Sequence, residues 1–160
     1  MLRKFILAGA GLLLLLSPPS WAQSTSGVTV NEPWVRGTVN GQTATGAFME
    51  LTASETTTLV GVSSPVAGFC EVHEMVLDNG IMKMRAMPKL DLPAGKRVAL
   101  KPGSYHIMLM DLKQPLQKGD SVPLMLKLEG KDKKFVMREV KAEVRDLTAS
   151  ANVHGGMYHH

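Results

Sequence analysis

Short runs of apolar and β-branched residues recur along this chain, with clusters of turn-forming residues between them. Within several runs the apolar and polar positions alternate, which is the period of a half-buried strand. Breaks such as Asp78-Asn79-Gly80 and Lys118-Gly119-Asp120 fall at the spacing of turns in an all-β sandwich. No long run of the sequence shows a helical period. The pattern predicts strands over residues 28–30, 46–52, 57–62, 71–77, 81–87, 97–100, 105–111, 121–129 and 133–144.

The first 22 residues have a different character. Arg3 and Lys4 precede an apolar run over 5–16, and Ser20-Trp21-Ala22 has the small-x-small form of a cleavage site. About a dozen apolar residues are too few to cross a bilayer, for which roughly 20 are needed. We therefore expect residues 1–22 to be a signal peptide for export to the periplasm. No cysteine lies beside the cleavage site to accept a lipid, so a lipid anchor is not expected. Stable membrane insertion is not expected either.

The mature chain would begin at Gln23, and its length fits one domain with its own core. We expect this domain over residues 23–147 and a polar tail over 148–160. Taking Arg3 and Lys4 from the 18 basic residues leaves 16 against 14 acidic ones, a net charge of about +2. The charges are scattered and not interleaved with aromatic residues. A nucleic-acid surface is therefore not expected. Separately, we expect the protein to be a monomer.

Histidine and methionine are concentrated in two parts of the chain. All five histidines lie either within residues 73–106 or among the last seven residues. A single methionine is usually a flexible filler of the core, but six of the eleven fall within one short stretch. These six are Met75, Met82, Met84, Met87, Met108 and Met110.

Strand parity places some of these side chains together, because successive residues of a strand point to opposite faces. In the strand over 105–111, an aliphatic and aromatic face alternates with an imidazole and thioether face. The first face, suited to the core, carries Tyr105, Ile107 and Leu109. The second face carries His106, Met108 and Met110, where a metal ion could reach them.

A hairpin is predicted around Asn79-Gly80, a strong turn signal after an alternating strand. If Asn79-Gly80 is the two-residue loop, Met75 faces Met84 and His73 is a diagonal neighbour of Met84. If the loop is Asp78-Asn79, His73 faces Met84 directly. Both registers put His73 and Met84 on one face, whereas a three-residue loop would put them on opposite faces.

Two imidazoles and two thioethers form a soft and neutral donor set. Thioethers favour copper(I) over zinc, calcium or magnesium, which prefer harder or anionic ligands. Because these ligands are neutral, the charge of a copper(I) site stays near +1. A partly exposed site of this kind can bind the ion and release it again, as a transfer protein must. The chemistry of these faces therefore predicts one copper(I) bound by histidine and methionine side chains.

The spacing of His73, Met84, His106 and Met108 resembles the motif of the PCuAC family of periplasmic copper chaperones, and this resemblance implies that these four residues bind the copper(I). That motif runs histidine, ten residues, methionine, twenty-one residues, histidine, one residue, methionine. The resemblance extends to Pro33-Trp34-Val35-Arg36 and Leu92-Pro93-Ala94-Gly95 and covers essentially the whole mature domain. It implies a cupredoxin-like Greek-key β-sandwich. It also implies delivery of copper toward the CuA site on subunit II of cytochrome c oxidase, beside a Sco-type thioredoxin-like protein.

Two further groups of soft side chains accompany this motif. Met75 and Met110 could serve as reserve thioether ligands or only line the site, and lining is the role we expect. The tail resembles the His- and Met-bearing extension with which some family members bind a second copper, as copper(II). Its candidate ligands are His154, Met157, His159 and His160.

The sequence leaves several alternatives to a copper chaperone. A blue-copper electron-transfer centre needs a thiolate, and Cys70 lies three residues from His73, which places the two on opposite faces of a regular strand. A copper-tolerance or buffering protein would use the same four donors. An exported sandwich with methionines in its core would bind no copper. No pattern of a nucleophile, base and acid stands out, so we do not expect an enzyme.

Overall fold

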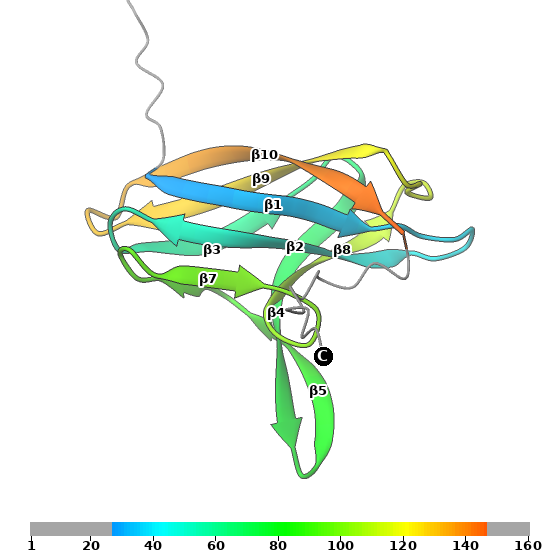
Figure 1. Cartoon of the computed structure of the whole chain (residues 1–160), viewed down its shortest axis with the longest axis horizontal. Helices are drawn as coiled ribbons and strands as arrows, with labels where there is room; N and C mark the ends of the chain where they lie inside the picture. The colour runs from blue at the N-terminus through cyan, green and yellow to red at the C-terminus, as the bar shows by residue number, and fades with distance from the viewer. Residues whose placement is uncertain (1–26, 147–160) are drawn as a thin grey trace, which may run out of the picture.

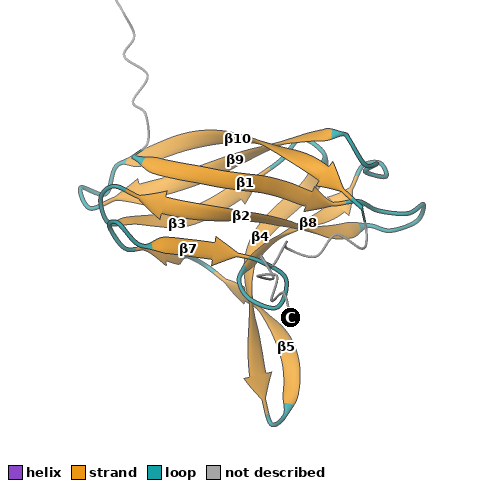
Figure 2. Cartoon of the chain, viewed as in Figure 1, coloured by secondary structure: helices purple, strands orange, loops and turns teal. Residues whose placement is uncertain are grey.

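The computed structural model describes residues 27–146, and all the regular elements in that range are strands (Figure 2). Among these residues no helix could cross a membrane. The signal peptide and the tail predicted for residues 1–22 and 148–160 lie outside the described range. The strands are β1 (Val28–Arg36), β2 (Ala44–Ala53), β3 (Thr57–Ser63), β4 (Ala67–Asp78), β5 (Ile81–Met87), β6 (Leu90–Leu92), β7 (Arg97–Leu100), β8 (His106–Leu112), β9 (Ser121–Gly130) and β10 (Phe135–Arg145).

Seven strands form a closed path in the order β4-β8-β2-β1-β10-β9-β3, which returns to β4 where Val62 pairs with Cys70. Strands β1 and β10 run parallel, and the other neighbours in this path are antiparallel. Figure 1 shows the path flattened into two layers. The predicted all-β sandwich is therefore confirmed.

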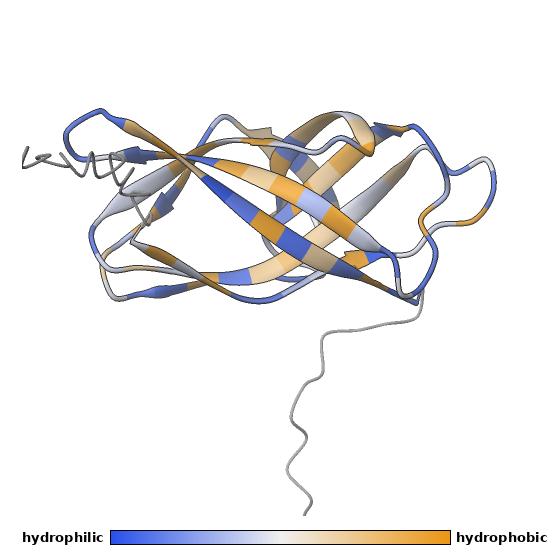
Figure 3. Ribbon diagram, turned by 90° about the horizontal axis from the view of Figure 1, so that it is seen from above, coloured by the Kyte–Doolittle hydropathy of each residue, from blue (hydrophilic) through white to orange (hydrophobic). Residues whose placement is uncertain are grey.

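The sandwich is held together by apolar side chains that alternate with polar ones along the strands, as the alternating colours in Figure 3 show. Ile107 and Leu109 of β8 are fully buried in this core. Each fully buried aliphatic side chain contributes about 1.5–3 kcal/mol relative to an exposed one. Burial of these two residues fixes which face of β8 points inward, and so turns Met108 and Met110 outward.

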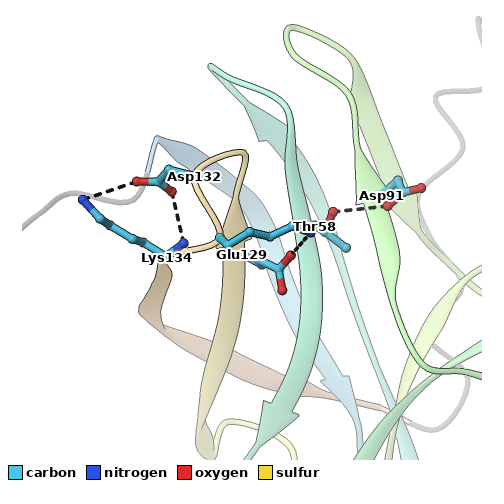
Figure 4. Close-up of polar contacts among 6 residues, drawn as sticks. Thr58, Asp91, Glu129, Asp132 and Lys134 are labelled. Carbon is cyan, nitrogen blue, oxygen red and sulfur yellow. Dashed lines mark hydrogen bonds and ion pairs between the residues drawn. The ribbon is translucent and has the colours of Figure 1, made fainter.

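One end of the sandwich is tied by polar contacts, shown in Figure 4. The Thr58 hydroxyl donates to a carboxylate oxygen of Asp91 at 3.2 Å and so joins β3 to β6. In the turn between β9 and β10, Asp132 accepts a hydrogen bond from the backbone N–H of Lys134 at 3.1 Å. These contacts tie β6 to β3 and hold the turn between β9 and β10.

The second half of β4 and all of β5 extend as a hairpin away from the sandwich (Figure 1). Asp78 pairs with Ile81 around a two-residue loop, and Asn79 and Gly80 have positive φ angles of 50° and 78°, as a type I′ turn requires. Of the two registers open from the sequence, the Asn79-Gly80 loop is the one formed. Met75 therefore faces Met84.

Candidate metal centre

The imidazole and thioether face predicted for β8 lies on the outer side of the sheet. Met108 and Met110 are half-buried, whereas Ile107 and Leu109 between and beside them are fully buried. On one side β8 pairs with β4, and on the other side it pairs with β2. Side chains from three strands can therefore meet over Met108.

The two histidines face each other across β4 and β8. His73 pairs directly with His106, and their ring centroids are 5.8 Å apart in an edge-to-face arrangement. On the hairpin side, His73 pairs with Ala86, so Met84 is its diagonal neighbour, as the formed register requires. Directly opposed side chains share a face of the sheet, so these donors lie on one surface.

His106 is held by the loop between β7 and β8. Its ring nitrogen Nδ1 lies 3.1 Å from the backbone carbonyl oxygen of Ser104, which can only accept a hydrogen bond. Burial lowers the pKa of His106, the charges of His73 and Arg36 lower it further, and the hydrogen bond to Ser104 opposes these effects. A lowered pKa favours the neutral imidazole, the form that can bind a metal ion.

His73 contacts Glu71, a residue that the sequence pattern did not single out, although strand parity places the two on one face of β4. Its ring nitrogen Nε2 lies 3.0 Å from a carboxylate oxygen of Glu71, which is two residues earlier on the same face of β4. The other ring nitrogen, Nδ1, is buried and has no hydrogen-bond partner among the described residues. Across β4 and β8, Glu71 pairs with Met108.

A cavity of about 330 Å³ lies beside the two rings and gathers most of the predicted donors. Its soft lining residues are Met75, Met84, His106 and Met108. His73 reaches this group through its contact with the His106 ring. Met110 lies further along β8, between Ala44 of β2 and Phe69 of β4.

An aromatic wall forms one side of the cavity and depends on a glycine. Gly46 pairs with Met108, and a Cβ atom at Gly46 would lie only 2.8 Å from the Phe48 ring. The missing side chain leaves room for that ring, whose centroid is 6.4 Å from that of His106. The Arg36 guanidinium lies over the Phe48 ring, 5.5 Å from its centroid, and also lines the cavity.

Cys70 takes no part in this surface. It pairs with Leu109 and packs against the core. Cys70 and His73 therefore lie on opposite faces of β4, as expected. Burial raises the pKa of the Cys70 thiol to about 11. Within residues 27–146 no three His, Cys, Asp or Glu side chains gather at one point, and the donors that do gather are imidazoles and thioethers.

A family model described as LpqE-like, after a lipoprotein, matches residues 28–141 of the chain. The chain belongs to this family, which is the PCuAC family. Two relatives support the assignment. Lxx21020 of Leifsonia xyli subsp. xyli, named as a lipoprotein, is 35% identical over 76% of this chain and 74% of its own length. RP573 of Rickettsia prowazekii is 33% identical over 66% of this chain and 61% of its own length.

Solved PCuAC domains share the fold. The apo PCuAC domain of PmoF2 aligns with a TM-score of 0.62 at 22% identity, over 78% of this chain and 94% of that domain. The copper(I) form of DR1885 from Deinococcus radiodurans aligns with a TM-score of 0.58 at 28% identity, over 79% of this chain and 83% of that protein. The PmoF2 domain has also been solved with copper bound. The cupredoxin-like fold predicted for this PCuAC chain is confirmed.

Proposed function

We propose that the chain is an exported copper(I) chaperone that carries one ion and passes it to an acceptor. The observation that carries the proposal is the meeting of His73 and His106 across β4 and β8, beside a cavity lined by Met84 and Met108. Related PCuAC proteins solved with copper support it, as do the leader-like residues 1–22. The protein would bind and transfer the ion without making or breaking covalent bonds in a substrate.

The chemistry of the cavity favours a soft ion of low charge. Two thioethers and two imidazoles suit copper(I) better than zinc or calcium. The fixed positive charge of Arg36 at the cavity repels a doubly charged ion about twice as strongly as a singly charged one, because the Coulomb energy scales with charge. Both effects select copper(I).

The position of Met84 favours transfer over storage. Met84 is 57% exposed and lies on the hairpin that extends from the sandwich, whereas His106 is only 6% exposed. An acceptor can thus approach one ligand of the ion without opening the core. Ligand exchange would begin at Met84 and end at His106.

Copper titration tests the proposal directly. We expect the mature chain, residues 23–160, to take one equivalent of copper(I) in competition with a coloured copper(I) chelator. A chain that ends at residue 147 should retain this equivalent. If residues 148–160 bind a second ion, as we propose for His154, Met157, His159 and His160, only the longer chain should take up added copper(II). A mature chain that leaves all copper(I) with the chelator contradicts the proposal.

For the acceptor we propose the CuA site on subunit II of cytochrome c oxidase, with a Sco-type thioredoxin-like protein as a second partner. The resemblance of the four-residue motif to PCuAC chaperones supports this choice. Deleting the gene should lower oxidase activity when copper is scarce, and added copper should restore it. A deletion strain that is impaired only at high copper would instead identify a tolerance or buffering protein.

A further inference from the structure

We propose that Glu71 is a positioning residue that makes His73 bind copper(I) through Nδ1, while His106 binds through Nε2. The inference rests on the proposed function and specifies which atoms perform it. It concerns a residue outside the four-donor motif and an asymmetry between two histidines that the motif treats alike.

The contact between Glu71 and His73 decides which nitrogen of His73 is free. An ionised carboxylate can only accept hydrogen bonds, so the Nε2 atom that lies 3.0 Å from it carries the proton. A neutral imidazole has one remaining lone pair, and in His73 this lone pair is on Nδ1. That atom is buried and has no hydrogen-bond partner among the described residues. A buried polar atom without a partner is costly, and a soft metal ion would satisfy it.

His106 has the opposite arrangement. Its Nδ1 donates to the Ser104 carbonyl oxygen at 3.1 Å, which leaves the lone pair on Nε2. In metal sites, a ligating histidine commonly donates its other N–H to a carboxylate or a backbone carbonyl. Glu71 and Ser104 supply one of each, at different nitrogens of two rings whose centroids are 5.8 Å apart.

This asymmetry bears on how Met84 takes part. Nδ1 is bonded to the ring carbon that joins the side chain, so an ion on Nδ1 lies closer to its own strand than an ion on Nε2. The ion is therefore displaced from the middle of the pair toward β4. Strand β5, which carries Met84, is the neighbour of β4 on the side away from β8. Binding through Nδ1 of His73 shortens the span that the Met84 side chain must bridge.

Substitution of Glu71 measures the contribution of its carboxylate. Loss of an outer-shell partner commonly weakens metal binding 10–100-fold, and Glu71 is partly exposed, so we expect a decrease of about tenfold in copper(I) affinity for Glu71→Ala. Glu71→Gln keeps an oxygen acceptor and should recover most of the affinity. The matched control is Glu74→Ala, which removes a carboxylate on the opposite face of β4 that is paired with Arg85. We expect the affinity of this control to equal that of the wild type.

Long-range ¹H–¹⁵N correlation spectra of the mature chain give a readout that a general loss of structure would not reproduce. In the copper-free protein, at a pH where His73 is neutral, this residue should be almost entirely the Nε2–H tautomer, and Glu71→Ala should lower the fraction of this tautomer toward that of a free histidine. Added copper(I) should shift the ¹⁵N resonances of His73 Nδ1 and His106 Nε2.

Two results would overturn the inference while the chaperone stands: copper(I) bound through Nε2 of His73 in the wild type, or equal affinities for Glu71→Ala and Glu74→Ala. A wild-type protein whose histidine resonances ignore copper(I) would overturn the proposed function and this inference together.

Discussion

Replacing His106 and Met108 together by alanine is expected to lower the copper(I) affinity at least about 100-fold, more than the loss of one outer-shell partner would. The two residues supply one imidazole and one thioether from the same face of β8. Without them the ion keeps only His73 and Met84, and Met84 is mostly exposed. Competition with a coloured copper(I) chelator measures the change, and circular dichroism checks that the variant is folded.

Cys70→Ser is the matched control for this experiment. Cys70 is on β4, three residues from His73, but it packs on the core side of the sheet. Its copper(I) affinity should equal that of the wild type. Unchanged copper(I) affinity in the double variant would show that His106 and Met108 are not ligands. Loss of affinity in Cys70→Ser would indicate that the Cys70 thiolate is a ligand.

Leu109→Ala is expected to lower the free energy of unfolding by about 2–5 kcal/mol, the usual cost of removing a leucine side chain from a core. Leu109 is fully buried and lies in β8 between Met108 and Met110. Its neighbours on β4 and β2 are Cys70 and Thr45, so the cavity left behind would open in the middle of the sheet. Urea denaturation followed by circular dichroism measures the change.

Met110→Ala is the comparison for this prediction, because it alters the next residue on the other face of β8. Met110 is only half-buried, so a decrease smaller than that of Leu109→Ala is expected. If the two variants lost equal stability, the assignment of an inner and an outer face to β8 would be wrong.

Much of the fold follows from local signals. Alternation predicted nine of the ten strands, and β5 and β7 have the predicted bounds. The strand predicted over 28–30 is longer in the structure, because a bulge between Asn31 and Trp34, with Glu32 at a φ of 45°, carries β1 past Pro33. Strand β6 was not predicted: its three residues are too few to show a period, and its pairing with β3 defines it.

The sequence by itself determined which side chains share a face within each strand. That property needs only the two-residue period of extended backbone, so His106 and Met108 could be placed together without a structure. The sequence also predicted a hairpin at Asn79-Gly80 but left its register open. The structure selected the register, because Asn79 and Gly80 have the positive φ angles of a two-residue loop. The copper-site residues themselves came from the spacing of the family motif, and their binding stays a prediction.

Only the tertiary structure decided what surrounds those residues. The pairing of His73 with His106 joins positions 33 residues apart, and such a pair forms because the core aligns β4 with β8, which no local period encodes. The same holds for the Ser104 carbonyl and for the Phe48 ring beside Gly46. For Glu71, strand parity predicts the face of β4 on which it lies. Its hydrogen bond to His73 depends on side-chain geometry that only the folded sheet provides.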